Sequence, residues 1–343
     1  MNSFGTLFRL TTFGESHGVA MGGVIDGCPP GVCLDIEEIQ REVDRRRPGT
    51  STLTTARRES DRVEWLSGIS AEGATLGTPI GFIVRNADQR SGDYDALRDC
   101  FRPNHADYTY VAKYGLRDHR GGGRASARET VCRVAGGAVA RQWLATRGIT
   151  VRAAILSVGP VKVEDPFAVA PGEVDAAVAE YVELMRAERD SAGGIVTARI
   201  CGLPAGLGEP VGDKFHARLG SAMLSINAAM GFEYGEGFGG AALRGSEMAD
   251  EMAPDGRGGV EMLTNHCGGV NGGITNGAVV TFRVAFKPTP TIARPLRSVD
   301  SAGNAVTVDA RGRHDPCVVI RAVPVVEAMA CLTVADMLLM SRR

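Results

Sequence analysis

The run SARETVCRVAGGAVARQWLATRG, from Ser126 to Gly148, is the clearest helical segment in the chain. Ser126 and Glu129 have the spacing of a capping box, in which two side chains bind the first backbone N–H groups of a helix. Small and apolar residues then recur at helical spacing and form one stripe that ends at Trp143. Gly148 suits the position just after a helix. We therefore predict one helix with an apolar stripe over residues 126–147.

A segment rich in glycine and arginine, residues 119–125, leads directly into this helix. Glycines allow a backbone to approach a ligand closely. The first N–H groups of a helix have no partner within the helix, and the helix dipole attracts an anion to them. Arg120, Arg124 and Arg128 add positive charge at the same place. The segment therefore predicts a binding site for a phosphate or a carboxylate.

The remaining segments mix helices and strands without the regular alternation of a parallel sheet. Apolar periodicity predicts helices at residues 35–46, 173–188, 213–230 and 325–340. It predicts strands at residues 6–12, 19–25, 63–66, 80–84, 149–158, 195–200 and 279–286. This irregular order favours an α+β fold. We expect residues 1–343 to form a single compact domain of two intertwined halves.

Composition argues against several classes of function. A net charge of −2 gives no field that would draw the 343-residue chain to nucleic acid or to a membrane. We find neither a secretory signal nor a run of about 20 apolar residues. Eight scattered cysteines without Cys-x-x-Cys spacing indicate free thiols in a reducing cytoplasm and no metal site. Only four of the 38 Lys and Arg residues are lysine, and arginine binds carboxylates and phosphates through two parallel hydrogen bonds.

The block Gly14-Glu15-Ser16-His17-Gly18 matches the Gly-x-Ser-x-Gly elbow of serine hydrolases. An elbow requires a helix directly after the serine, whereas a strand-like run follows here. A serine hydrolase therefore stands as the alternative function. His17 is a candidate acid or base at the end of a strand, or else a polar residue of a turn.

Two further blocks place charged residues at the ends of predicted elements. In the loop that holds His105, Asp107 can cap the following helix or favour the charged form of the imidazole. Arg45, Arg46 and Arg47 end a predicted helix, where they can interact with its dipole or bind an anion. Three consecutive residues spread over most of a helix circumference. We therefore expect at least one of these arginines to point inward or toward a ligand.

Two blocks in the last fifth of the chain carry similar chemistry. Lysine and hydroxyl groups at residues 287–291 follow a predicted strand and suit contact with a phosphate or a ribityl chain. Residues 311–317 combine two arginines, a histidine and Asp315. A buried carboxylate beside an arginine stays ionised and can orient a base. The alternative for this block is a surface turn that ends at Pro316.

Together these blocks resemble chorismate synthase. The resemblance rests on residues 13–18, 44–49, 102–107, 123–130 and 312–317, which occur in the family's order and span nearly the whole chain. It implies a β-α-β sandwich, in which a layer of helices lies between antiparallel sheets. It also implies a carbon–oxygen lyase (EC 4.2.3.5) that uses reduced FMN. Such an enzyme converts 5-enolpyruvylshikimate 3-phosphate to chorismate and phosphate by anti 1,4-elimination, the last common step of the shikimate pathway to aromatic amino acids.

The resemblance also assigns expected roles to individual residues. The catalytic residues would be His17, which protonates the departing phosphate, His105, which protonates the reduced flavin or holds its charge state, and Asp315, which assists removal of the ring proton. The substrate would be bound by Arg46, Arg47, Arg102 and Arg128. The flavin would be bound by Arg124, Ala125, Ser126, Asn227, Ala228, Gly272, Lys287, Pro288, Thr289, Pro290, Thr291 and Arg313.

Assembly and supply of reducing equivalents are further implications of the resemblance. We expect a cytoplasmic homotetramer with no metal. Thr52 and Pro290 stand where many family members carry an arginine and a serine. The chain is short for the family and has no room for the insertions of members that reduce their own flavin. We therefore expect FMN reduced by an external flavin reductase, with NADPH as an indirect reductant.

Overall fold

Most strands belong to two five-stranded antiparallel sheets. The computed structural model describes residues 2–49, 53–54, 59–87, 97–256, 258–309 and 315–341. The first sheet has the order β1 (Ser3–Phe4), β2 (Arg9–Gly14), β3 (Ala20–Asp26), β5 (Ile80–Arg85) and β4 (Val63–Trp65). The second has the order β7 (Val161–Lys162), β6 (Thr150–Val158), β8 (Gly194–Cys201), β14 (Val280–Phe286) and β9 (Ala229–Tyr234). Mixed helices and antiparallel sheets confirm the predicted α+β class.

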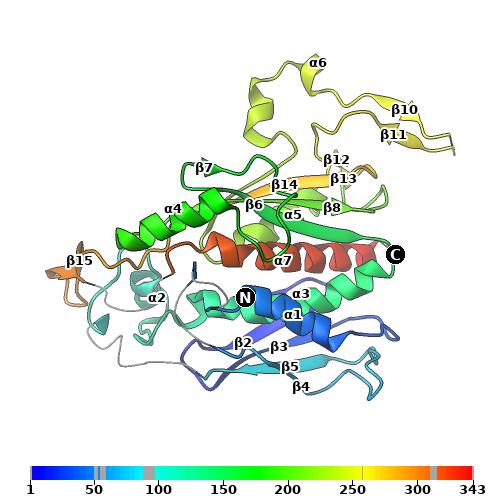
Figure 1. The fold of residues 1–343 in the computed structure, drawn as a ribbon. Coiled ribbons are helices and arrows are strands. Elements are labelled where there is room, and N and C mark those ends of the chain that lie inside the picture. Colours follow the sequence, from blue (N-terminus) through cyan, green and yellow to red (C-terminus); the bar gives the residue numbers. More distant parts are fainter. Residues whose placement is uncertain are drawn as a thin grey trace.

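Three long helices lie between the two sheets (Figure 1). They are α1 (Ile36–Arg46), α3 (Thr130–Ala145) and α7 (Val319–Met340). Helix α5 (Phe215–Leu224) packs against α7 and β9, whereas α4 (Ala176–Ala187) packs against β6 and β7. Helix α2 (Asp107–Tyr114) lies at one end of the molecule, below α4 in the view of Figure 1.

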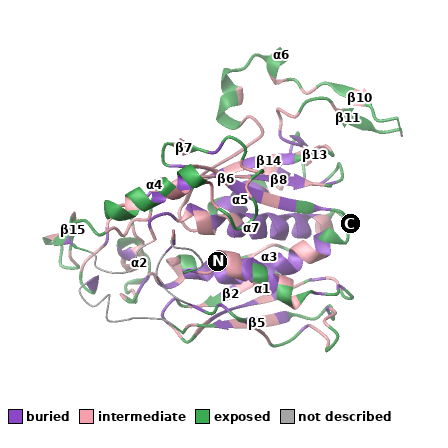
Figure 2. Cartoon of the chain, viewed as in Figure 1, coloured by how far each residue is buried: buried purple, intermediate pink, exposed green. Residues whose placement is uncertain are grey.

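The buried side chains gather in and around the helical layer (Figure 2). Helices α3 and α7 approach most closely at Gly137, where an added Cβ would lie 2.4 Å from the Cβ and 2.5 Å from the Cα of Ala328. Trp143 of α3 stacks on Phe8 with ring centroids 6.2 Å apart. The central helices therefore contact each other almost backbone to backbone, and one continuous apolar cluster reaches both sheets.

Helix α7 carries two buried carboxylates that bind backbone N–H groups on opposite sides of the helical layer. Asp336 Oδ1 accepts from Leu7 and Phe8 at 2.6 and 3.0 Å, before β2 begins. Glu327 Oε1 accepts from the Ala153 N–H of β6 at 2.8 Å. The helix is long and apolar enough to cross a membrane, but 83% of its most apolar 18-residue stretch is buried inside the protein. Its apolar residues therefore face other parts of this chain.

The predicted helix at residues 126–147 begins later than expected. Two 3-10 turns, η2 (Gly123–Ala125) and η3 (Ala127–Glu129), precede α3. Ser126 Oγ accepts from the Arg128 N–H at 3.2 Å, one residue before the Glu129 N–H that a capping box requires. The carboxylate of Glu129 instead accepts from Thr12 Oγ1 at 2.7 Å and from Arg133 at 2.8 Å. The predicted capping box is therefore wrong, because tertiary partners take the glutamate.

Two other predicted helices have different bounds. The helix predicted at 213–230 ends at Leu224, because Ala229 and the residues after it pair with β14. The last helix begins at Val319 and includes Pro324, which we expected to precede it. Its first turn closes before the proline, since the N–H groups of Arg321 and Ala322 both bind the carbonyl of Val318. The helix predicted at 35–46 is present as α1, and Asp35 caps it by accepting from the Glu38 N–H at 2.9 Å.

An arm that the periodicity did not predict projects from the end of β9 (Figure 1). It contains η4 (Gly237–Ala242), α6 (Gly245–Met248), β10 (Met252–Pro254) and β11 (Val260–Met262). Apolar side chains on this arm are exposed, among them Phe238, Met252, Val260 and Leu263. Shorter hairpins are formed by β12 (Val270–Asn271) with β13 (Ile274–Thr275) and by β15 (Leu296–Val299) with β16 (Ala305–Val308).

Candidate active site

The glycine-rich turn before α3 contacts two histidines that lie far apart in the sequence. A Cβ added to Gly121 would lie 2.4 Å from Nδ1 of His17, and one added to Gly122 would lie 3.4 Å from Nε2 of His105. Gly121 also has a φ of +75°, which favours glycine. His17 is buried, with its Nδ1 3.1 Å from Ser16 Oγ. The absence of side chains at Gly121 and Gly122 therefore lets the turn lie against both imidazoles.

A cavity of about 470 Å³ opens beside this turn. Its lining includes His105, Tyr110, the three glycines of the turn and Arg124. Glu15 and Asp118 also line it, and burial raises the pKa of Glu15 although Arg124 opposes the change. A cavity of this size falls in the range that small-molecule ligands occupy. We call it the His105 cavity.

Asp107 lies at the centre of the polar contacts behind His105. Its carboxylate accepts from Nε and Nη2 of Arg102, each at 2.8 Å, and from His105 Nδ1 at 2.9 Å. Burial alone would raise the pKa of Asp107, but the hydrogen bonds from Arg102 and His105 hold it well below its usual range. The expected helix cap is wrong, because the residue before α2 is Ala106 and Asp107 turns to these partners.

His105 itself is kept neutral by its surroundings. Burial is the largest influence on its pKa and lowers it, with Arg102 and Arg117 acting in the same direction and Asp107 against them. The expectation that the carboxylate favours the charged imidazole is therefore wrong for the net result, because desolvation outweighs the attraction. A neutral imidazole can accept a proton at one nitrogen while it donates from the other.

Asp315 lines a second, smaller cavity of about 60 Å³ together with Arg46, Asn227, Ala228 and Arg321. Its Oδ2 accepts from Arg321 Nη1 at 2.8 Å. Burial raises the pKa of Asp315, although Arg321 and Arg46 act against this change. A carboxyl group with a raised pKa is a better proton acceptor at neutral pH than an ordinary aspartate. The pairing of Asp315 with an arginine agrees with the sequence prediction. The raised pKa of Asp315 does not, because the prediction was a carboxylate that its arginine keeps ionised.

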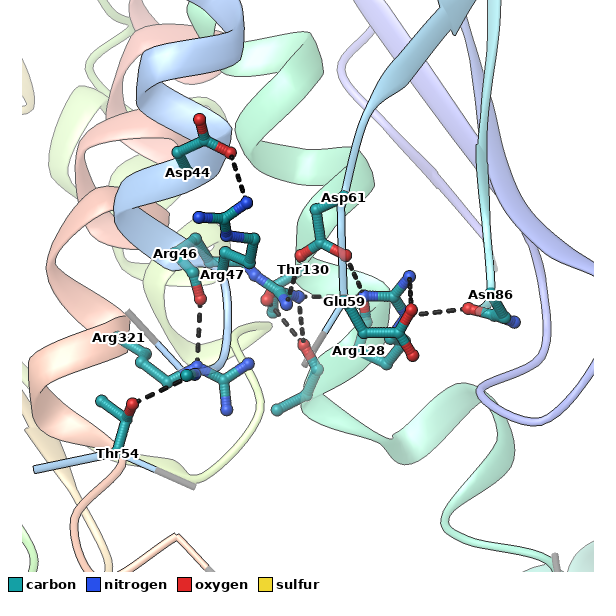
Figure 3. Close-up of polar contacts among 12 residues, drawn as sticks. Asp44, Arg46, Arg47, Thr54, Glu59, Asp61, Asn86, Arg128, Thr130 and Arg321 are labelled. Atoms are coloured by element: carbon teal, nitrogen blue, oxygen red, sulfur yellow. Dashed lines mark hydrogen bonds and ion pairs between the residues drawn. The ribbon is translucent and has the colours of Figure 1, made fainter. Parts of the chain in front are cut away.

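Arg46 at the end of α1 and Arg128 in η3 belong to a buried ion-pair network (Figure 3). Asp61 lies between them: Oδ2 accepts from Arg46 Nη2 at 3.0 Å and Oδ1 accepts from Arg128 Nη1. Asp61 is fully buried and has a φ of +47°, which is uncommon for a residue with a side chain. Burial lowers the pKa of Arg46 to about 9 although Asp61 opposes this. The prediction that one of the three helix-end arginines points inward holds for Arg46.

Sequence analysis did not identify Asp61 or its neighbour Glu59 as part of the site. Glu59 Oε2 lies 3.7 Å from Arg128 Nη2. The two acids lie two residues apart and follow directly on Arg57 and Arg58, which is the signal that could have indicated them. Arg47, in contrast, is half-buried, and its Nη1 lies 3.8 Å from Asp44 Oδ1.

Several predicted flavin-binding residues lie around the His105 loop and the Asp315 cavity. Arg124 donates to Thr12 Oγ1 at 2.6 Å. Asn227 Nδ2 donates to the carbonyl of Ala125 at 2.8 Å, so the segments that hold these two residues are in contact. Lys287 Nζ donates to the carbonyl of Asn104, next to His105, and the Lys287 N–H donates to the carbonyl of Ala228. Ser126, Pro288, Thr289, Pro290 and Thr291 belong to these same segments.

Gly272 is the exception among the described residues. It lies in the β12–β13 hairpin, at the opposite end of the molecule from α2 (Figure 1). A Cβ added there would meet no atom within 4 Å, so the hairpin tip faces open space. Arg313 and Thr52 lie outside the described residues.

The serine hydrolase alternative fails on local structure. Ser16 lies in the turn between β2 and β3, which pair with each other as an antiparallel hairpin. A nucleophile elbow needs a strand, a sharp turn and then a helix. The Gly-x-Ser-x-Gly match is therefore coincidental in this chain.

Comparison with known proteins gives one consistent answer. A sequence model described as chorismate synthase matches residues 8–339. A chorismate synthase of Porphyromonas gingivalis is 53% identical over 100% of this chain and 96% of its own length. One of Bacteroides fragilis is 51% identical over 99% of this chain and 98% of its own length. A crystal structure of a chorismate synthase matches with a TM-score of 0.75 and 29% identity, covering 98% of this chain and 92% of the other.

Proposed function

The chain belongs to the chorismate synthase family, and we propose that His17, His105 and Asp315 carry the proton transfers of the family's reaction. The reaction converts 5-enolpyruvylshikimate 3-phosphate to chorismate and phosphate by anti 1,4-elimination, which makes the protein a carbon–oxygen lyase of the shikimate pathway. The family uses reduced flavin. The observation that carries the proposal is the Gly121–Gly122 turn, which contacts both imidazoles.

The residues around the two cavities fit reduced FMN. Asn227 Oδ1 and Thr289 Oγ1 are buried and have no hydrogen-bond partner within the part of the chain that the structure describes. Both belong to the predicted flavin-binding segments, so a ligand with polar edges would satisfy them. We assign Arg124, Ala125, Ser126, Asn227, Ala228 and residues 287–291 to holding the flavin. When bound, reduced FMN would supply electrons only transiently, because the reaction is redox-neutral overall.

Each proton-transfer role follows from the surroundings of the side chain. His17 is buried beside Ser16 and protonates the departing phosphate. His105 is neutral and takes up and returns a proton beside the flavin through Nε2, which faces the turn that borders the His105 cavity. Asp315 accepts the ring proton, because burial raises its pKa toward the range where an acid can act as a base.

The charge on the substrate requires the arginines. Two carboxylates and a phosphate need several guanidinium groups in a site with little water. We assign this binding to Arg46, Arg47, Arg102 and Arg128, with Arg313 as a further contact to the flavin. Arg46 and Arg128 are already held near each other by Asp61, so their charges do not have to be brought together when the substrate arrives.

An anaerobic assay with photoreduced FMN and 5-enolpyruvylshikimate 3-phosphate tests the proposal. Wild-type protein forms chorismate, and His17→Ala lowers kcat by about 100-fold or more, the usual contribution of a positioned acid. Ser16→Ala keeps a substantial share of activity, which a hydrolase nucleophile would not. His216→Gln is a matched control, because His216 lies on α5 and stacks on Tyr234. Absence of chorismate with the wild-type protein would refute the proposed function.

We also propose that the family's sandwich fold acts as a single domain and assembles into a homotetramer. The exposed apolar residues of the arm support association, since Phe238 alone is 85% exposed and Met252 and Val260 are more than half exposed. Gly272 independently supports association of protomers, because its hairpin lies far from the proposed flavin-binding segments of its own protomer. In the tetramer Gly272 of one protomer would serve the site of another.

Subunit complementation tests this arrangement. A His17→Ala protomer and a Gly272→Trp protomer are each inactive alone under the proposal. Mixed after mild dissociation, they regain activity if the two residues act in different protomers. No regain of activity, or a mass by sedimentation equilibrium equal to one chain of 36.1 kDa, would contradict the proposal.

We propose that a separate, cytoplasmic flavin reductase supplies reduced FMN, with NADPH as the indirect electron source. NADPH and oxidised FMN alone would then give no chorismate, and addition of a flavin reductase would start the reaction. Turnover with NADPH and FMN in the absence of a reductase would show instead that this chain reduces its own flavin.

A further inference from the structure

The carboxylate of Asp107 contacts His105 directly, and through Arg102 it is connected to the glycine turn that contacts His17. We propose that Asp107 is a positioning residue that fixes the tautomer of His105 and holds the Gly121–Gly122 turn against both imidazoles. The inference deepens the proposed function and rests on it for the role of His105, but its geometry stands on contacts that do not depend on the reaction.

The tautomer follows from hydrogen-bond chemistry. An ionised carboxylate has no proton to donate, so the 2.9 Å contact between Asp107 Oδ1 and His105 Nδ1 requires the proton on Nδ1. The proton of a neutral imidazole can be on only one nitrogen, so Nε2 keeps its lone pair. Nε2 is the atom that faces Gly122, at the border of the His105 cavity. Asp107 thereby selects the nitrogen that exchanges protons with bound ligands.

The second action of Asp107 passes through Arg102. The carboxylate binds Arg102 at three points: Nε and Nη2 at 2.8 Å each and the backbone N–H at 3.0 Å. Arg102 Nη2 then donates to the carbonyl of Gly121 at 2.8 Å. Because Gly121 is in contact with His17, this chain of bonds fixes the turn relative to both histidines. Arg102 and Asp107 are both buried, although Asp107 also lines the His105 cavity.

Other charged groups around His105 cannot replace this carboxylate. Arg117 lies 3.3 Å from Asp107 Oδ1 and, like Arg102, repels a proton from the imidazole. Glu15 and Asp118 line the same cavity, and Asp118 pairs with Arg120. His17 lies across the glycine turn. Within the described residues, Asp107 is the carboxylate that contacts the His105 ring.

Nitrogen-15 NMR of protein labelled at histidine tests the tautomer directly. Wild-type protein should show His105 protonated at Nδ1 across the neutral range. In Asp107→Asn the amide oxygen pairs with Arg102, and the amide N–H groups face His105, so the proton should move to Nε2. An Nε2–H tautomer in wild type, or an unchanged Nδ1–H tautomer in the variant, would overturn the inference. The wild-type measurement decides the question even if the variant does not fold.

Activity provides the second readout. Asp107→Asn should lower kcat by about 100-fold or more, because the wrong nitrogen then faces the cavity. The acidic limb of its pH–rate profile should also move to lower pH, since the carboxylate that attracts a proton to the ring is gone. Asp26→Asn is the matched control, because Asp26 forms a half-exposed pair with Arg9. An unchanged pH profile in Asp107→Asn would reduce Asp107 to a structural role. Failure of the proposed function would appear differently, as a wild-type protein without turnover but with the Nδ1–H tautomer.

Discussion

Replacement of Asp61 by asparagine isolates the charge at the centre of the arginine network. Asparagine keeps the shape of the side chain and tolerates the left-handed backbone that Asp61 adopts at φ +47°. Alanine would confound the result, because it would also disturb this backbone. The variant therefore leaves Arg46, which is 1% exposed, without its carboxylate, and leaves Arg128, which is 2% exposed, with Glu59 at 3.7 Å.

The size of the effect follows from burial. Removal of one partner from a buried ion pair costs about 3–5 kcal/mol, because the remaining charge is left without compensation. For a chain of this size that corresponds to a fall in the unfolding midpoint of roughly 4–7 °C. Asp26→Asn removes a half-exposed pair with Arg9 and should cost about 1 kcal/mol or less.

The direction of the change in the Asp61 pKa determines how its contribution to stability depends on pH. Burial would raise the pKa of Asp61, but Arg46 and Arg128 outweigh it and lower the pKa. The contribution of Asp61 is therefore fully present above the unfolded pKa of about 3.9 and is lost as the pH falls through the folded value. Thermal unfolding at fixed protein concentration should show a constant gap between wild type and Asp61→Asn from pH 5 to 8. A gap below about 1 kcal/mol, or one that widens in acid, would refute the reasoning.

Three further predictions concern packing and protonation. Gly137→Ala should lower the unfolding free energy by about 1–3 kcal/mol, because its Cβ meets the Ala328 backbone. Gly136→Ala should change the unfolding free energy by about 1 kcal/mol or less, because its Cβ meets the Leu10 side chain. Urea unfolding of the two variants compares these effects. Asp315→Asn should lower kcat by about 100-fold or more while stability at pH 8 stays equal to or above wild type, because burial raises the pKa of Asp315 and makes its ionised form costly. Burial lowers the pKa of His105, so wild type should lose stability as pH falls below about 6.5, and His105→Gln should lose less over the same range.

The sequence predicted elements well where local pattern and tertiary structure agree. Helix α1 matches its prediction because Asp35 caps it and Ile39 and Val43 form its buried face. The capping box at Ser126 shows the opposite case, because Glu129 finds stronger partners in Thr12 and Arg133. Such partners are distant in the sequence, and no local spacing predicts them.

The same limit applies to the site. Arginine clusters, histidines in glycine-rich blocks and Asp315 were visible as residue types in particular settings. Their counterions were not: Asp61 reaches Arg128 across 67 positions of the sequence, and only the fold brings them together. Desolvation could not be read from the sequence either, which is why the expected direction of the change in the His105 pKa was wrong.

Helix α7 has a consequence for the lengths that this chain can tolerate. Arg321, Glu327 and Asp336 take hydrogen-bond partners in three different parts of the molecule: the Asp315 cavity, β6 and the turn before β2. One inserted or deleted residue rotates everything beyond it by about 100° around the helix axis. Insertion or deletion of one residue between Arg321 and Asp336 would therefore break at least one of these attachments. The rotation of side chains around one helix axis thus fixes the number of residues between Arg321 and Asp336.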